Sequence, residues 1–309
     1  YNSMQNATSH TAIRTLSVIF FLLASAWLLN GCSESHSSQE PDQHKHLNIT
    51  VLLDLSDRIS EKKNPEQAQR DIANIVTIVK QLKNVIEQKG AVFAKDKIKV
   101  VFYPNNYGEE AAALCGNMLY DFGAMDIQQR KTAWEEIESV YVQNLTKLYQ
   151  LAAKAERFNG SDLFSYFRHR AEDDCIEQNL NYVNTLVVFS DGYLYSKDAQ
   201  YRKDNRFSYI VPESQHLTQF RSREDWEVEF DSGNYGFISP GKKFHNLSVL
   251  ALEFAPAQNH PKDFDIMKKY WSNWFTEMGL PENRYKIVKT DMPVLTGKLI
   301  QRYLINQVR

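Results

Sequence analysis

The sequence predicts an α/β domain built on a mostly parallel sheet with helices on both faces. Apolar, β-rich segments alternate along the chain with segments whose apolar residues recur at the helical period of 3.6. Such continuous apolar runs are typical of strands that are buried on both faces of a sheet. The expected strands are 47–54, 97–103, 185–190, 246–254 and 285–288. The expected long helices are 65–90, 126–158, 263–278 and 293–303.

The composition is that of an ordinary folded protein and argues against a nucleic-acid partner. Hydrophobic residues make up 43% of the 309 residues, which is enough for a core, and the 12 Gly and 9 Pro are too few for a low-complexity chain. The 36 Lys and Arg nearly balance the 38 Asp and Glu. Because binding to nucleic acid needs a concentrated basic face that neutralises phosphates, we expect no nucleic-acid partner.

The amino-terminal segment has the pattern of an export signal. Arg14 precedes an uncharged apolar run over 15–29, which is shorter than the ~20 residues of a membrane span. The motif LNGC, which ends at Cys32, resembles the lipobox of bacterial lipoprotein signal peptides. The resemblance implies that residues 1–31 are removed and that a lipidated Cys32 holds the chain on the lipid bilayer. The alternative is a general signal peptide that happens to contain a cysteine.

The residues after Cys32 predict a tether and a destination. No apolar side chain occurs in 33–46, so 32–46 is expected to be a disordered tether and 47–309 the folded domain. The residue that follows the cysteine is Ser33 and not the Asp that retains many lipoproteins in the inner membrane. The resemblance therefore favours a bacterial outer-membrane lipoprotein.

Two cysteines remain in the folded part, Cys115 and Cys175. In an oxidising envelope they can pair as a disulfide, and the alternative is two buried free thiols. Their spacing matches no zinc or iron–sulfur motif.

Three short polar clusters are expected at one edge of the sheet. Residues 54–60 follow the first strand, 160–162 follow the long helix, and 190–192 follow a central strand. In open α/β sheets, functional loops lie at the carboxyl ends of the strands. Carboxylates and hydroxyls are the ligands that Mg²⁺ prefers, so the clusters indicate a divalent-cation site. The alternative is ordinary turn formation and helix capping, for which Asp, Ser and Gly are also favoured.

The order of these clusters resembles the von Willebrand factor A (vWA) domain family over roughly 47–309. That family has a Rossmann-like fold and a metal-ion-dependent adhesion site. The site is built from an Asp-x-Ser-x-Ser loop, a Thr loop and a later Asp. By position, Asp54 and Ser56 match the first two loop ligands, Ser161 matches the Thr, and Asp191 matches the later Asp.

The sequence departs from the family pattern at Arg58, which stands where the last Ser of the loop is expected. A guanidinium has no acceptor and stays protonated, so it cannot bind a cation. We expect Arg58 to donate hydrogen bonds to Asp54 and Asp191 and so to take over the electrostatic role of the metal. The site is then a degenerate one, and we expect Mg²⁺ or another divalent cation to bind weakly or not at all.

An aromatic-rich insertion over about 193–245 follows the strand that carries Asp191. Its Tyr, Trp and Phe residues alternate with Arg and Glu, a mixture that is enriched in the cores of protein interfaces. Trp226 and Tyr235 are therefore candidates for contact with a partner. The alternative is a small subdomain whose aromatic residues pack on one another.

These features favour a membrane-tethered, non-enzymatic binding or adhesion module whose partner is an unknown envelope or extracellular protein. The first alternative is a metal-dependent hydrolase that uses the acidic sheet edge. Against it, the sequence has no set of nucleophile, His and acid and no nucleophile-elbow motif. The second alternative is a solute-binding lipoprotein, but the sequence has no internal duplication that would give two lobes.

Overall fold

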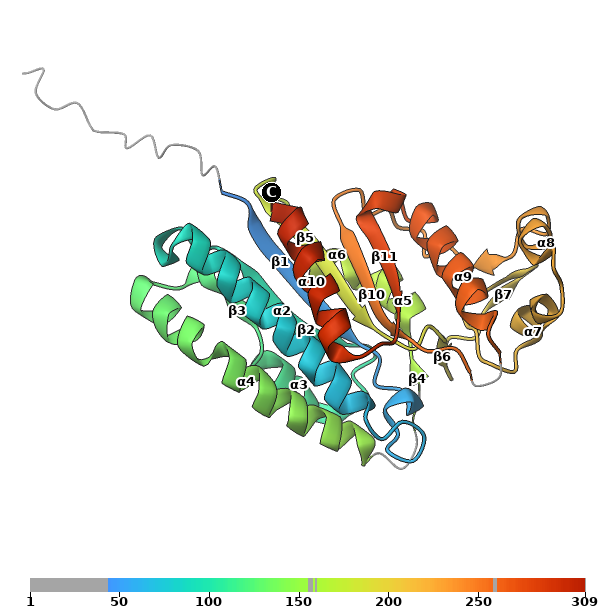
Figure 1. Cartoon of the computed structure of the whole chain (residues 1–309), viewed down its shortest axis with the longest axis horizontal. Helices are drawn as coiled ribbons and strands as arrows, with labels where there is room; N and C mark the ends of the chain where they lie inside the picture. The colour runs from blue at the N-terminus through green and yellow to red at the C-terminus, as the bar shows by residue number, and fades with distance from the viewer. Residues whose placement is uncertain (1–43, 155–157, 159, 258–259, 309) are drawn as a thin grey trace, which may run out of the picture. The chain divides into compact units, whose positions relative to one another are not determined.

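A six-stranded, mostly parallel sheet forms the centre of the fold (Figure 1). The computed structural model describes residues 44–154, 158, 160–257 and 260–308. The strand order is β11-β10-β5-β1-β2-β3, and all neighbours are parallel except the short β3, which is antiparallel to β2. The strands are β1 (His46–Leu53), β2 (Lys97–Phe102), β3 (Tyr120–Asp121), β5 (Tyr182–Phe189), β10 (Ser248–Phe254) and β11 (Tyr285–Lys289).

The five predicted strands are all present, and the first begins slightly earlier than expected. The prediction of a disordered tether is wrong for residues 44–46: His44 and Lys45 contact Phe93 and Leu180, and His46 is buried in β1, where its backbone N–H donates to the carbonyl oxygen of Asn181 at 2.9 Å. The other residues of the predicted tether up to 43, the predicted signal peptide and Cys32 lie outside the described residues.

Helices cover both faces of the sheet (Figure 1). One face is covered by α2, α4 and α10, and the other by α5, α6 and α9. The helices are α2 (Gln67–Lys89), α3 (Gly108–Gly116), α4 (Ile127–Ala153), α5 (Leu163–His169), α6 (Ala171–Cys175), α7 (Gln215–Arg221), α8 (Trp226–Ser232), α9 (Asp263–Glu277) and α10 (Pro293–Val308). Short 3-10 turns are η1 (Asp57–Ile59), η2 (Ala91–Phe93), η3 (Phe122–Ala124) and η4 (Glu282–Arg284). The architecture is therefore a Rossmann-like α/β fold.

The long helix α4 shows how the sequence sets an element's limits. Asp126 caps it by accepting from the Gln129 N–H at 2.8 Å, and the Gln129 side chain accepts in return from the Asp126 N–H at 2.9 Å. Its apolar stripe, which includes Ile137, Tyr141 and Leu145, is fully buried against the sheet side of the molecule. The helix ends at Ala153, five residues before the predicted end at 158.

The insertion forms a small layer beside α9. It contains α7, α8 and four short strands, of which three pair in the order β7-β8-β9. Those strands are β6 (Tyr195–Ser196), β7 (Arg202–Lys203), β8 (Arg206–Phe207) and β9 (Gly236–Phe237). The fourth strand, β6, pairs with β4 (Gly160–Ser161), which precedes α5. This pairing ties the insertion to the sheet edge.

The parallel arrangement gives the domain two distinct edges. All five long strands start at one edge, the amino-terminal edge, and end at the other, the carboxyl edge. Residues 44–309 form one compact unit with apolar clusters on both faces of the sheet, so this unit carries its own core. Within the described residues, no helix is both long and apolar enough to cross a membrane.

Candidate functional site

The predicted site residues Asp54 and Asp191 follow neighbouring strands at the carboxyl edge. Asp54 comes directly after β1, and its N–H donates to the carbonyl oxygen of Phe189 at 2.9 Å, at the end of β5. Asp191 comes two residues after β5. The two carboxyl groups lie close enough for the charge on Asp54 to affect the titration of Asp191. The structure therefore brings together the two acids that sequence analysis selected.

Asp54 is buried and is held by neutral donors. Its Oδ1 accepts from the Ser56 N–H at 3.0 Å, and its Oδ2 accepts from the Ser190 hydroxyl at 3.0 Å. Burial raises the pKa of this carboxyl, because desolvation disfavours its charged form. The positive charge of Arg58 and the hydrogen bonds lower the pKa by less than burial raises it. Ser190 was not among the predicted site residues, although it precedes Asp191 in the same polar cluster.

Asp191 is half-buried, unlike Asp54, and it too accepts from a neutral donor. Its Oδ1 accepts from the Tyr193 N–H at 3.0 Å. Burial, and after it the neighbouring Asp54 carboxylate, raises the pKa of Asp191 to about 7. The following Gly192 has φ +94°, and a Cβ there would lie 2.7 Å from the ring of Phe254, so this turn requires glycine. Two partly desolvated acids thus share one region without a hydrogen-bonded cation among the described residues.

Ser161 reaches the same edge through β4. The next residue, Asp162, donates its N–H to the carbonyl oxygen of Tyr103, just after β2, and β4 pairs with β6, which follows β5. Gly160 makes this pairing possible, since a Cβ there would lie 2.0 Å from the carbonyl oxygen of Tyr195. Ser161 is only 5% exposed, and its hydroxyl has no hydrogen-bond partner. Burying a hydroxyl without a hydrogen-bond partner costs free energy, so the Ser161 oxygen is available to bind a cation or a hydrogen-bond donor.

Arg58 does not make the predicted contacts. Its guanidinium forms a two-pronged ion pair with Asp71 of α2, with Nη1–Oδ2 at 2.8 Å and Nη2–Oδ1 at 3.1 Å. Nη1 also donates to the main-chain oxygen of Asp54 at 3.1 Å, and not to the carboxylate of Asp54 or Asp191. The prediction that Arg58 donates to the carboxylates of Asp54 and Asp191 is wrong, because its guanidinium is already bound to the carboxylate of Asp71 on the adjacent helix α2. The charge of Arg58 still lowers the pKa of both site acids.

Arg58 and Asp71 belong to a buried polar cluster that sequence analysis missed. Asp71 also accepts from the Tyr149 hydroxyl at 2.6 Å and from the Gln67 amide at 2.8 Å. The Gln67 amide in turn reaches Glu253 at 3.1 Å. A signal for it exists in the sequence, because Gln67 and Asp71 are spaced i, i+4 and so lie on one face of α2.

Glu253 ends this cluster in an unusual backbone conformation. It lies in β10 at φ +69°, at an irregularity in the pairing with β11. Its carboxylate accepts from Asn74 at 3.0 Å, from Thr290 at 2.8 Å and from Arg70 at 3.3 Å. Four donors, counting Gln67, hold a residue whose left-handed conformation is costly for a side chain with a Cβ.

The aromatic residues of the insertion pack mainly on one another. Trp226 is only 7% exposed, and its ring lies 6.3 Å from that of Phe220. Tyr235 is half-buried, with its ring 5.0 Å from Phe220. The interpretation of Trp226 as an exposed partner contact was wrong, since it belongs to the aromatic core that the insertion shares with α9. Tyr195 and Tyr201 are the exposed aromatic residues of this region.

The two cysteines are free thiols and do not form the disulfide that was considered. Cys115 lies in α3 beside the core of the α2–α4 face, whereas Cys175 is buried in α6 on the other face of the sheet. Burial raises the pKa of Cys115 to about 12 and that of Cys175 to about 11. Neither thiol is therefore reactive at neutral pH.

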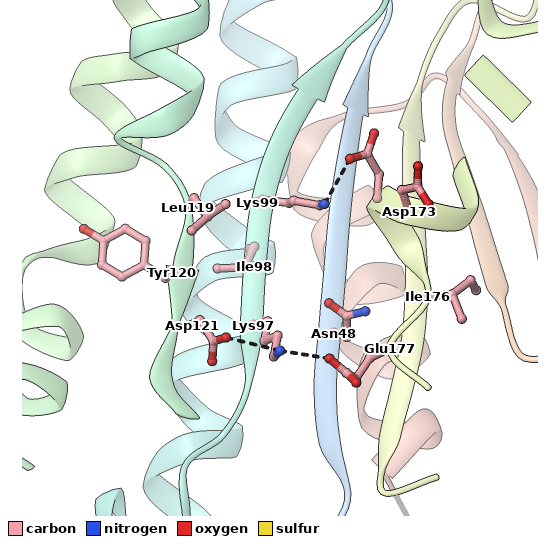
Figure 2. Close-up of a pocket in the computed structure, with 11 residues that line it drawn as sticks. Asn48, Lys97, Ile98, Lys99, Leu119, Tyr120, Asp121, Asp173, Ile176 and Glu177 are labelled. Atoms are coloured by element: carbon pink, nitrogen blue, oxygen red, sulfur yellow. Dashed lines mark hydrogen bonds and ion pairs between the residues drawn. The ribbon is translucent and has the colours of Figure 1, made fainter. Parts of the chain in front are cut away.

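A shallow pocket of about 180 Å³ lies elsewhere, over β2 and β3 (Figure 2). Lys97 there lies between Asp121 at 3.2 Å and Glu177 at 2.9 Å, and Lys99 contacts Asp174 at 3.2 Å. Apart from Asp173, its charged groups are paired with one another, unlike the acids of the carboxyl edge.

The carboxyl edge offers only oxygen donors, the type of ligand that a hard divalent cation prefers. It offers the oxygens of Asp54 and Asp191, the hydroxyl of Ser56 and the unpartnered hydroxyl of Ser161. Among the described residues no three His, Cys, Asp or Glu side chains converge, so a cation here would depend on hydroxyl and water oxygens as well.

Comparisons with known proteins identify no family. No family model and no curated protein matches the chain. Among solved structures, the pilus adhesin SpaC from Lactobacillus rhamnosus GG is 11% identical, with a TM-score of 0.42, over 86% of this chain and 31% of that one. Proximal thread matrix protein 1 from the mussel byssus is 9% identical, with a TM-score of 0.35, over 85% of this chain and 48% of that one. The chain thus spans less than half the length of either.

Proposed function

We propose that the chain is a membrane-tethered, non-enzymatic binding module whose carboxyl edge contacts a partner protein. The observation that carries the proposal is the presence at one sheet edge of two acids with neutral hydrogen-bond donors only, Asp54 and Asp191, and of the unpartnered buried hydroxyl of Ser161. Groups left unsatisfied in the free protein are expected to gain a partner in the functional state.

A weakly bound divalent cation is the partner that these groups fit best. Asp54, Asp191, Ser56 and Ser161 would hold it, and Mg²⁺ is the best match to an all-oxygen donor set. Because the site supplies only two carboxylates, the cation would keep open positions that accept an acidic oxygen of the partner protein. The buried positive charge of Arg58, partly balanced by Asp71, keeps the affinity low.

The exposed tyrosines supply the second part of the contact surface. Tyr195 pairs with Ser161 across β4 and β6, so it lies directly beside the site. Tyr195 and Tyr201 are 41% and 52% exposed, and tyrosine is enriched among residues that dominate binding energy at interfaces. Together with the acids, they give an acidic centre with an aromatic rim.

Capture from native bacterial envelopes tests this proposal. The immobilised domain should retain a partner in Mg²⁺, release it in EDTA, and lose it in the Asp191→Asn and Tyr201→Ala variants. Asp265→Asn, which changes an exposed acid on α9, is the matched control and should capture normally. Capture that ignores EDTA and Asp191→Asn would contradict the proposed site.

Membrane tethering has its own test. If Cys32 is lipidated, the full chain should incorporate a labelled fatty acid in a bacterial host, and Cys32→Ala should not. Absence of label in the wild-type chain would contradict the tether and leave the carboxyl-edge site untouched.

One observation favours a second function, a metal-dependent hydrolase. A carboxyl whose pKa is raised to about 7 can serve as a general base near neutral pH. Hydrolysis of model phosphate and acyl esters that depends on both Mg²⁺ and Asp191 would decide for this alternative. The solute-binding alternative has no such support, since the described residues form one unit and not two lobes.

A further inference from the structure

Four exposed apolar side chains gather at the amino-terminal edge, opposite the candidate site. We call them the amino-edge patch: Val92, Phe93, Ile127 and Leu180, which are 69%, 51%, 55% and 80% exposed. Val92 and Phe93 form the turn η2 before β2, Ile127 begins α4, and Leu180 precedes β5. Single exposed apolar residues are common on protein surfaces, but several at one edge mark an interaction site.

Contacts with the first described residues show that two members of the patch lie beside the start of β1. The ring of His44 lies 5.0 Å from that of Phe93. Next to it, the Lys45 ammonium donates to the main-chain oxygen of Leu180 at 3.0 Å. His44 and Lys45 therefore contact both η2 and the turn that carries Leu180.

Arg130 joins the rest of the patch. Its Nη1 donates to the main-chain oxygens of Ala91 at 2.9 Å and Val92 at 2.7 Å. Arg130 lies one turn after Ile127 in α4, so η2 and the start of α4 are neighbours. The segments that carry the four side chains are thus neighbours at the amino-terminal edge.

Positive charge accompanies the patch. In the described part of the chain, Lys45 and Arg130 donate to main-chain oxygens and form no ion pair, although the exposed Asp126 lies one helical turn before Arg130. Two other acids of this edge are already paired, Asp96 with Lys89 at 2.6 Å and Glu177 with Lys97 at 2.9 Å, and Asp126 caps α4 by accepting from the Gln129 N–H. Exposed apolar side chains flanked by free cations match the chemistry of an anionic bilayer surface.

We propose that the amino-edge patch rests on an anionic lipid bilayer. The proposal extends the proposed function, because residues 33–43 allow at most about 40 Å between Cys32 and His44 and so keep a lipidated domain close to the membrane. Val92 and Phe93 insert among the headgroups, and Lys45 and Arg130 contact lipid phosphates. Since β1 begins at this edge and β4 and β6 lie at the other (Figure 1), the carboxyl-edge site then faces away from the bilayer.

Co-sedimentation with lipid vesicles tests the proposal without any lipid anchor. The protein is the chain from residue 32 with Cys32→Ser, which retains the whole compact unit of residues 44–309. It should bind vesicles that contain phosphatidylglycerol, less so at high salt, and hardly bind pure phosphatidylcholine. The double variant Phe93→Ser, Leu180→Ser should bind about tenfold more weakly, since it loses most of the apolar contact. Lys45→Gln should cost about fivefold.

Two further variants serve as controls for the vesicle-binding experiment. Val294→Ser removes an equally exposed apolar side chain, 70% exposed, from the start of α10 at the opposite edge, and should bind as the wild type does. Val92→Asp changes the more exposed residue of η2 and should also weaken vesicle binding, so it replaces the double variant if that protein fails to fold.

Equal binding by the patch variants and the wild type would overturn the proposal. So would a wild-type dimer that Phe93→Ser dissociates, because a second copy would then cover the patch. Fatty-acid labelling of Cys32 is a separate readout, so failure of the tether and failure of this surface can be told apart.

Discussion

Two polar clusters begin in the same loop and differ in whether their carboxylates have a cationic partner. The loop's Arg58 enters a cluster with Asp71, Gln67 and Glu253, in which each carboxylate accepts hydrogen bonds from several donors. Asp54, four residues earlier, belongs to the carboxyl-edge site, where Asp54 and Asp191 accept hydrogen bonds from neutral donors and the Ser161 hydroxyl has no partner.

The difference separates a structural role from a functional one. Asp71 and Glu253 already pair with guanidinium groups and so gain little from a cation, although Arg58 Nε and Asn74 Oδ1 in their cluster lack hydrogen-bond partners, and breaking the Arg58–Asp71 pair leaves a buried charge. A carboxylate that burial desolvates without a cationic partner carries a cost that a bound cation or a proton removes. We therefore assign the Arg58 cluster to stability and the carboxyl edge to binding.

The largest expected effect comes from breaking the satisfied cluster. Asp71→Ala leaves the Arg58 guanidinium buried without its acid, and should lower the free energy of unfolding by about 3–5 kcal/mol. Urea unfolding measures it, with Asp265→Asn as a control that changes stability by less than ~0.5 kcal/mol. A loss below ~1 kcal/mol would mean that the ion pair is dispensable. Arg58→Ser should likewise destabilise the fold, so it is a poor test of metal binding.

A similar loss of stability is expected when a buried residue is removed from the aromatic core of the insertion. Trp226→Ala removes a buried ring from its contacts with Phe220 and Phe230, and should cost about 3 kcal/mol. Tyr201→Ala, at an exposed ring, should change stability by less than ~0.5 kcal/mol while it weakens partner capture. Thermal unfolding of both variants checks the division. Equal losses would show that the exposed tyrosine is part of the core.

A smaller effect, with a defined pH dependence, is expected at Asp191. Its pKa is about 7 in the folded state and about 3.9 in an unfolded chain, so the folded state holds this proton more tightly. The resulting stability is complete below pH ~4 and is lost as the pH rises through ~7. Between these limits the wild type should lose on the order of 2 kcal/mol relative to Asp191→Asn. Parallel pH profiles for the two proteins would contradict a desolvated Asp191.

The smallest expected effect has the opposite sign. Ser161→Ala removes a buried hydroxyl that has no partner, so without metal it should leave stability unchanged or raise it by up to ~1 kcal/mol. Ser190→Ala is the matched control, because its hydroxyl donates to Asp54 and its loss should cost about 1 kcal/mol. If Ser161→Ala is the more destabilising of the two, its hydroxyl is already satisfied in the free protein.

The sequence was sufficient for the features that depend on local pattern. Apolar runs and the 3.6-residue period predicted five strands and the long helices, and the parallel topology then placed Asp54 and Asp191 at one edge. Features that depend on tertiary neighbours were missed. Arg58 turns to Asp71 because α2 packs beside the loop, and Trp226 is buried because α8 folds back on α7 and α9. The two cysteines lie on opposite faces of the sheet, which their spacing does not reveal.

The most direct test of the carboxyl edge as a cation site is calorimetric titration with Mg²⁺. We expect weak binding by the wild type, with a Kd on the order of 1 mM, and none by Asp191→Asn or Ser161→Ala. Asp265→Asn should bind as the wild type does. No heat with the wild type, or equal binding by all four proteins, would contradict the assignment of the carboxyl edge as a cation site.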